Sequence, residues 1–68
     1  MKNRIRELRE QDGLTQKQLG EKVGVSRQAI NAIETGKFDP SIWLAYNIAQ
    51  LFNSTIENVF DFKESEQK

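Results

Sequence analysis

The chain has 68 residues, ten of them basic and ten acidic, and it contains neither histidine nor cysteine. A chain of this length forms a single domain and buries only about 60% of its unfolded surface. The composition excludes disulfides, thiol chemistry and cysteine-ligated zinc, and it removes the commonest general base.

The charges divide unevenly along the chain. Up to Lys37 there are eight basic and five acidic side chains, which gives +3, and the remainder has two basic and five acidic ones, which gives −3. Such an asymmetry is typical of a basic working face and an acidic far end, although ordinary solvated charge is the alternative.

No apolar run approaches the roughly 20 residues of a membrane span. Residues 1–4 also lack the apolar stretch of a signal peptide. We therefore expect a soluble cytoplasmic protein without a membrane partner.

Helical spacing of apolar residues dominates over strand alternation. We expect a first helix from about Asn3 to Gln11, ended by Gly13, because glycine accepts the left-handed conformation after a helix. A second helix begins after Thr15, where Thr15 and Gln18 form a Thr-x-x-Gln capping box, and it ends at Gly24.

A third helix begins after Ser26 and ends at Gly36, and a fourth begins after Ser41 and ends at Asn53. In the fourth helix the residues expected to face inward are Ile42, Leu44, Ala45, Ile48, Ala49 and Phe52.

The last helix is short, and either Ser54 or Thr55 caps it. The alternation from Phe60 to Phe62 also allows a short strand. We expect an all-α fold, a compact five-helix bundle, with a domain over residues 1–60 and a polar C-terminal extension over 61–68.

The segment from Gln16 to Thr35 has the pattern of a helix-turn-helix. Leu19 anchors the first helix, Gly20 is small where the second helix crosses, and Gly24 supplies the positive φ of the turn. Apolar residues fill the remaining inner positions: Val23, Val25, Ile30 and Ile33. A plain helical hairpin in another small bundle is the alternative.

With these residues the chain resembles the compact DNA-binding domains of the lambda-repressor-like superfamily, of Cro and phage-repressor type. The landmarks lie between Ile5 and Phe60 and are Leu14-Thr15-Gln16, Leu19-Gly20, Val23-Gly24-Val25-Ser26, Ile30, Ile33-Glu34, Gly36-Lys37, Pro40-Ser41-Ile42, Ile48-Ala49 and Ile56-Glu57.

The resemblance implies that the third helix enters the major groove of double-stranded DNA. Base-reading candidates are the outward residues Arg27, Gln28, Asn31 and Ala32. Gln28 suits adenine, because an amide can donate to N7 and accept from N6. Arg27 suits either guanine or a phosphate, and Ala32 offers only a methyl contact. The alternative for each is a solvated helix face.

Phosphate contacts are expected from Gln16, Ser26, Thr35, Lys37 and Ser41. For Gln16 the alternative is a capping or solvent role. Arg9 looks like a further DNA contact, but the resemblance places it against Glu34 as a partly buried structural ion pair.

Family members pair around a two-fold axis, so the resemblance implies a homodimer. Candidate interface residues in the acidic half are Leu51, Val59, Phe60 and Phe62. Trp43 and Tyr46 lie on the more exposed face of the fourth helix, and either an interface or packing against the Phe38 turn accounts for them.

The leading hypothesis is a prokaryotic transcriptional regulator, a nucleoid-associated repressor that binds a palindromic operator. The alternative is an antitoxin-like module that covers a toxin partner. We expect no enzyme activity, cofactor, metal or small-molecule ligand, because the residues that such chemistry needs are missing or unclustered.

Overall fold

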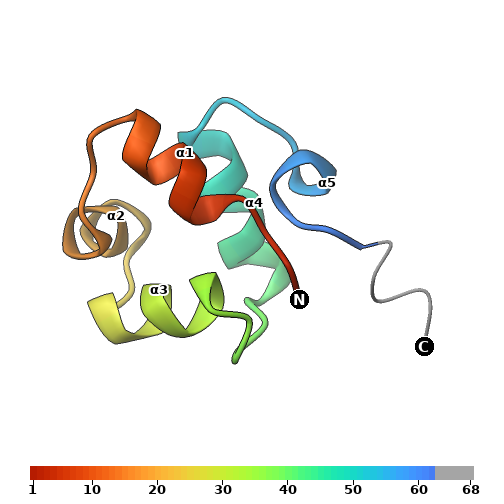
Figure 1. Ribbon diagram of the computed structural model, residues 1–68, viewed down its shortest axis with the longest axis horizontal. Coiled ribbons are helices and arrows are strands. Elements are labelled where there is room, and N and C mark those ends of the chain that lie inside the picture. The colour runs from red at the N-terminus through yellow and green to blue at the C-terminus, as the bar shows by residue number, and fades with distance from the viewer. Residues whose placement is uncertain (63–68) are drawn as a thin grey trace.

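The computed structural model describes residues 1–62, and its regular structure consists of five short helices (Figure 1). Their bounds are α1 Ile5–Gln11, α2 Gln16–Val23, α3 Arg27–Glu34, α4 Ile42–Leu51 and α5 Ile56–Val59. Residues 1–62 contain no strand, so the expected all-α fold of five helices is confirmed. Of the expected extension at 61–68, residues 63–68 lie outside the described part of the chain.

Hydroxyl side chains cap the helices that build the helix-turn-helix and the one that follows. The Thr15 hydroxyl accepts from the Gln18 amide at 3.0 Å, and the Gln18 side chain accepts from the Thr15 amide at 2.9 Å. Ser26 caps α3 and Ser41 caps α4, each accepting a bond of 3.1 Å from the amide three residues later. A cap of this kind typically contributes about 1 kcal/mol, because it satisfies an amide that the helix leaves unpaired.

Helix ends and loops follow the expected turn residues, with two refinements. Asn53 has φ of 52° after α4, a conformation that asparagine tolerates. Thr55 rather than Ser54 then caps α5. At the other end, α1 begins two residues later than expected, and the Asn3 side chain accepts from the Ile5 amide at 3.2 Å.

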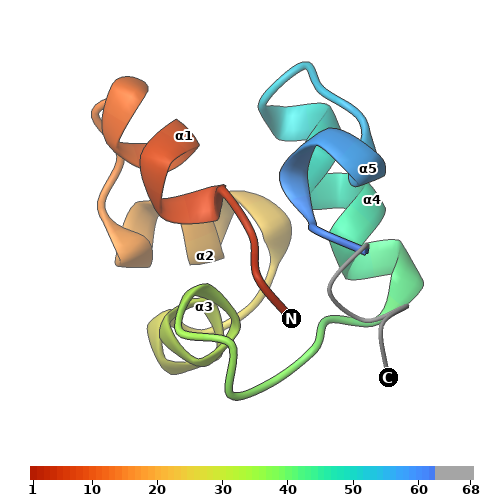
Figure 2. The same ribbon diagram turned by 45° about the vertical axis from the view of Figure 1, so that its right-hand side comes forward.

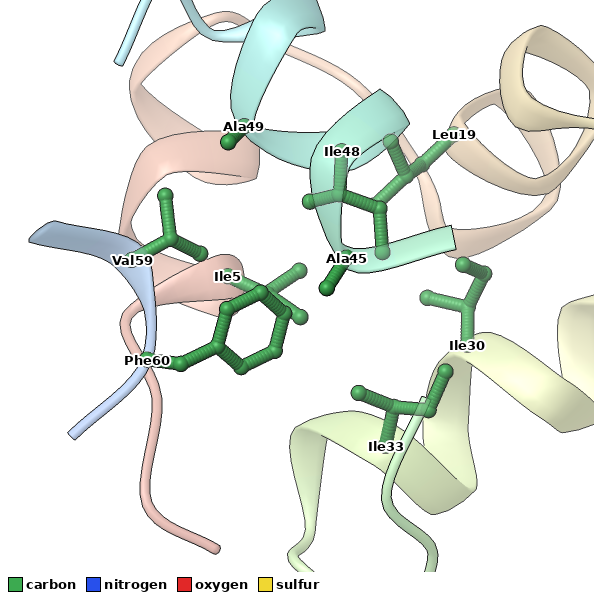
Figure 3. Close-up of a cluster of buried hydrophobic side chains, with 9 residues drawn as sticks. All are labelled: Ile5, Leu19, Ile30, Ile33, Ala45, Ile48, Ala49, Val59 and Phe60. Atoms are coloured by element: carbon green, nitrogen blue, oxygen red, sulfur yellow. The ribbon is translucent and has the colours of Figure 1, made fainter. Parts of the chain in front are cut away.

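All five helices contribute to one apolar core (Figure 3). Its buried members are Ile5, Leu19, Ile30, Ile33, Ala45, Ile48, Ala49, Val59 and Phe60. Burying a large aliphatic or aromatic side chain stabilises a fold by about 1.5–3 kcal/mol. One inward assignment was wrong: Ile42 is 65% exposed, because it is the first residue of α4 and lies at the end of the helix, one turn before the buried Ala45.

The N-terminal residues run beside the end of α5. The Arg4 amide donates to the Val59 carbonyl and the Asp61 amide donates to the Lys2 carbonyl, both at 2.8 Å. Asn3 and Phe60 thereby form an isolated antiparallel bridge instead of a strand.

The helices form two groups around the core (Figure 2). In this view α1, α2 and α3 lie on one side, and α4 and α5 lie on the other. The loop from Thr35 to Ser41 connects the groups, so α3 ends and α4 begins next to this loop. The helix that is expected to read DNA therefore lies at an outer edge of the molecule, with the core behind it.

Candidate nucleic-acid interface

A tight turn joins α2 to α3. The Val25 amide donates to the Gly20 carbonyl at 2.9 Å, and Gly24 has φ of 81°. A Cβ added to Gly20 would lie 2.5 Å from the Val25 carbonyl oxygen and 3.3 Å from the backbone of Ser26. A small residue was expected here because the second helix crosses, but the close neighbour is the backbone of the turn and of the α3 cap.

The starts of α2 and α3 open into one groove, lined by residues 14–17 and 25–27. Helix N-termini present unpaired amides and a partial positive charge, which favour an anion. Lys17 and Arg27 are exposed and add two full positive charges, against the single carboxylate of Glu21 in the lining. The groove thus has the electrostatic character of a phosphate site.

The outward face of α3 is free to meet a partner. Ile30 and Ile33 point into the core, whereas Arg27, Gln28 and Asn31 are exposed. Within residues 1–62 the side chains of these three polar residues have no hydrogen-bond or ion-pair partner. Their donors and acceptors therefore face outward together, from the first two turns of the helix.

The last turn of α3 is different. The Ala32 carbonyl accepts from the amides of Lys37 and Phe38 at 2.9 and 3.2 Å, and the residue is half-buried. The Thr35 hydroxyl donates to the Asn31 carbonyl at 2.9 Å. Thr35 must give up this bond before its hydroxyl can donate to a phosphate.

The other candidates for phosphate contacts are exposed and have donor groups that are free to bind a phosphate. The hydroxyls of Ser26 and Ser41 accept from backbone amides, so each keeps its own proton to donate. The ammonium group of Lys37 has no ion-pair partner within residues 1–62. Ser26 lies in the groove, whereas Lys37 and Ser41 lie in the loop between α3 and α4.

A largely buried ion pair ties α1 to the end of α3. The Arg9 guanidinium donates to the Glu34 carboxylate through Nε at 2.8 Å and Nη2 at 3.3 Å, and through Nη1 to the Leu14 carbonyl at 2.8 Å. Only 11% of the Arg9 side chain and 3% of the Glu34 side chain are exposed. The hydrogen bond to Glu34 raises the pKa of Arg9 against the lowering effect of burial. Arg9 is therefore held inside the protein and not offered to DNA.

Gln16 joins the same network. Its side-chain amide donates to the Glu34 carboxylate at 3.2 Å, and the residue is half-buried at the groove. An amide nitrogen carries two protons, so one remains for a second acceptor. The network thus places the Gln16 amide at the groove where α2 and α3 begin.

The expected interface residues are not on one surface. Val59 and Phe60 are 1% and 2% exposed and belong to the core, so they offer no area to a partner and their assignment to a dimer interface is withdrawn. Leu51 is half-buried against the core, and only Phe62 is exposed. Phe60 and Phe62 line the same groove, but Phe60 follows α5 directly and closes the core, whereas Phe62 lies farther along the chain at the rim of the groove.

Two residues that bear on the site were not singled out from the sequence. Lys17 follows Gln16 in the first turn of α2, and its place just after a helix cap is a usable signal. Asn3 donates from its side chain to the Ile33 carbonyl at 2.8 Å and so ties the N-terminal segment to the end of α3. No sequence pattern predicts that long-range hydrogen bond.

Comparison with known proteins agrees with this geometry. A helix-turn-helix family model matches residues 5–59. An uncharacterized HTH-type transcriptional regulator of Archaeoglobus fulgidus is 50% identical over 66 residues, which cover 97% of this chain and 94% of that protein. The regulator YgzD of Bacillus subtilis, also uncharacterized, is 47% identical over 64 residues, covering 94% and 97% of the two chains.

A chain in the solved SinR protein/SinI protein complex has the same fold, with a TM-score of 0.77 and 25% sequence identity. The match covers 93% of this chain but 62% of that one. Among residues 1–62 there is no helix with the length and apolar character to cross a membrane. The chain belongs to the helix-turn-helix family of Cro and phage-repressor type, and it is a transcriptional regulator with a DNA-binding domain.

Proposed function

We propose that this regulator is a repressor that binds a palindromic operator as a homodimer, with the N-terminal half of α3 in the major groove. The observation that carries the proposal is the free outward face of that helix. Arg27, Gln28 and Asn31 are exposed, and their side chains have no partner within residues 1–62. A base-reading surface needs polar groups of this kind, whose donors and acceptors are free to bind base edges.

Each of these side chains has a distinct task in the proposal. Gln28 reads adenine through a bidentate amide contact. Arg27 contacts guanine or a phosphate, since a guanidinium fits both. Asn31 lies one helical turn from Arg27 and reaches a neighbouring base pair. Ala32 contributes at most a methyl contact, because it is half-buried at the end of the exposed face.

Phosphate contacts fix the orientation of the domain without reading sequence. Ser26 and Gln16 bind one phosphate in the groove, with Lys17 alongside. Lys37 and Ser41 bind another beyond the far end of α3. Thr35 takes part only if its bond to the Asn31 carbonyl breaks. The Arg9–Glu34 pair acts through structure, by holding α1 and Gln16 in place.

The charge distribution supports a modest affinity for DNA in general. The half of the sequence that contains α3 has a net charge of +3, and the remainder has −3. We therefore expect weak non-specific binding and a steep loss of binding with added salt. In this proposal the regulator works at the nucleoid in the cytoplasm and performs no catalytic step. Its DNA-binding domain spans residues 1–60, and residues 61–68 form a C-terminal extension.

The test is selection of bound duplexes from a random pool, carried out at low salt where phosphate contacts are strongest. Enrichment of a two-fold-symmetric site is the expected result. Enrichment of an asymmetric site would contradict the homodimer. The absence of any enrichment would contradict sequence-specific binding altogether.

A second candidate is an antitoxin-like module whose helices cover a protein partner. The observation in its favour is that the structural neighbour was solved as a complex of two named proteins. A gene for a small toxin beside this one would favour that function. Failure of the DNA selection, together with stable co-purification of the neighbouring gene product, would establish it over the repressor.

A further inference from the structure

One face of α4 is apolar, exposed and uncharged. Among residues 1–62, the exposed large hydrophobic side chains are Ile42, Trp43 and Tyr46 on α4, Phe38 in the loop before it and Phe62 after α5, and we name this set the α4 face. Trp43 is 74% exposed. Residues 40–56 contain no Asp, Glu, Lys or Arg, although 29% of the chain is charged. The outer side of a helix that packs on a core and is otherwise exposed to water normally carries charged side chains. The outer side of α4 has none, so it is suited to contact with another protein surface.

Four of the five members of the α4 face lie close together. Ile42 and Tyr46 are one helical turn apart, and Trp43 projects beside them. Ile42 and Phe62 line one shallow groove together with Pro40. The apolar side of α4 is therefore continuous with Phe62 at the end of the described chain, and Phe38 belongs to the loop that leads into α4.

We infer that the α4 face docks on the α4 face of a second copy of this chain, a contact that rests on the homodimer proposed above. A two-fold interface brings the same patch of both copies together. An uncharged patch meets its copy without like-charge repulsion or desolvation of ions. The outer face of α1 is a poorer choice, because Arg4–Glu7 and Arg6–Glu10 ion pairs cover it.

The position of the face agrees with symmetric DNA binding. Lys37 and Ser41, the proposed phosphate contacts beyond α3, flank Phe38 and adjoin Ile42 in the chain. The α4 face therefore borders the proposed DNA surface at the C-terminal end of α3. Pairing there puts that end of each reading helix toward the two-fold axis and leaves Arg27 and Gln28 on the outer base pairs of each half-site.

The size of the face predicts a weak dimer. Aromatic side chains have about 150–250 Å² each, so the exposed parts of these five residues amount to an area on the order of 500 Å² per copy. Two copies then bury roughly 1,000 Å², the lower limit for a specific interface. We expect monomer and dimer to exchange in solution, and a palindromic duplex to favour the dimer by holding two copies together.

The first experiment is sedimentation of the full chain over a concentration series, combined with tryptophan fluorescence. Trp43 is the only tryptophan, so its emission reports on this surface alone. The wild type should dimerise with rising concentration while its emission moves to shorter wavelength. Trp43→Ala should stay monomeric, and Gln11→Ala, an exposed change on α1, should dimerise like the wild type. Circular dichroism checks that both variants remain folded.

The second experiment compares a full palindromic duplex, obtained by selection, with a duplex that contains one half-site. Trp43→Ala should bind the full site about tenfold more weakly or worse, and the half-site within about twofold of the wild type. As a geometric check, Asn47→Cys introduces a lone thiol beside the face of a chain that has no cysteine. Oxidation should cross-link it, whereas Gln11→Cys should stay monomeric.

The outcomes separate this inference from the proposed function. A wild type that stays monomeric up to its solubility limit and on the full site would overturn the docking surface and leave the face to a partner of other sequence. Equal dimerisation of Trp43→Ala and the wild type would overturn it too. If the wild type dimerises through α4 but enriches no duplex, the docking surface stands and the DNA-binding proposal fails.

Discussion

Gly20→Ala tests the packing of the helix-turn-helix most sharply, because two physical effects predict opposite signs. Alanine is about 1 kcal/mol better than glycine inside a helix, so helix propensity alone predicts a more stable protein. The new Cβ, however, would lie 2.5 Å from the Val25 carbonyl oxygen, which is backbone and cannot rotate away. The turn must move, or the variant cannot form the observed geometry.

The magnitude follows from the contacts that the movement disturbs. Overpacking of this kind costs about 1–3 kcal/mol. Loss of the 2.9 Å bond from the Val25 amide to the Gly20 carbonyl adds about 1 kcal/mol. After subtraction of the propensity gain, we expect a net loss of about 1–3 kcal/mol in the free energy of unfolding. For a domain of this size that lowers Tm by roughly 4–8 °C per kcal/mol.

Thermal unfolding followed by circular dichroism measures this directly. Lys22→Ala is the matched control, because Lys22 is exposed in the same helix and its replacement should change Tm little. A Tm of Gly20→Ala at or above that of the wild type would refute the packing argument, since propensity would then outweigh the close approach.

Three further substitutions probe the site. Gln28→Ala should weaken specific binding by about 1–3 kcal/mol and relax the preference at one base pair; unchanged preference in a repeated selection would remove Gln28 from base reading. Lys37→Ala should weaken binding to all duplexes alike and reduce the slope of log affinity against log salt by about one, and a sequence-dependent loss would argue against a phosphate contact. Glu34→Ala should lower the free energy of unfolding by about 3–5 kcal/mol, because it leaves the buried Arg9 charge unpaired. A small change in Tm for Glu34→Ala would show that Arg9 reaches solvent.

Local sequence signals predicted the helices well. Thr15, Ser26 and Ser41 cap helices where they were expected to, because each cap is decided by residues within one turn. Gly24 and Asn53 adopt the positive φ that the turns require, for the same local reason. The resemblance to a known family rested on residues between Ile5 and Phe60, and the family model matches residues 5–59.

The sequence did not predict which apolar side chains are buried, because burial depends on contacts between distant parts of the chain. Ile42 is as apolar as Ile48, and only the packing of α4 against the core decides which one is exposed. Phe60 and Phe62 are two positions apart and line the same groove, yet only Phe60 is buried. The segment that carries them is placed by bonds to Lys2 and Arg4, at the far end of the chain.

For the site, residue types on α3 were readable from helical periodicity, but their partners were not. The sequence does not reveal that Gln16 bonds to Glu34 or that Thr35 bonds back to Asn31, since both depend on side-chain conformation. The hydroxyls of Ser26 and Thr35 were given the same role. Only the Ser26 hydroxyl keeps its proton free to donate, because the Thr35 hydroxyl donates to the Asn31 carbonyl.

We propose that the exposed face of α3 reads base sequence. The most direct test is the ratio of wild-type affinities for the selected duplex and for a duplex of the same composition in shuffled order, measured at one physiological salt concentration. We expect a ratio of about 10³ or more, as for specific operators. A ratio near one would contradict it, because it would mean that the domain binds phosphates only.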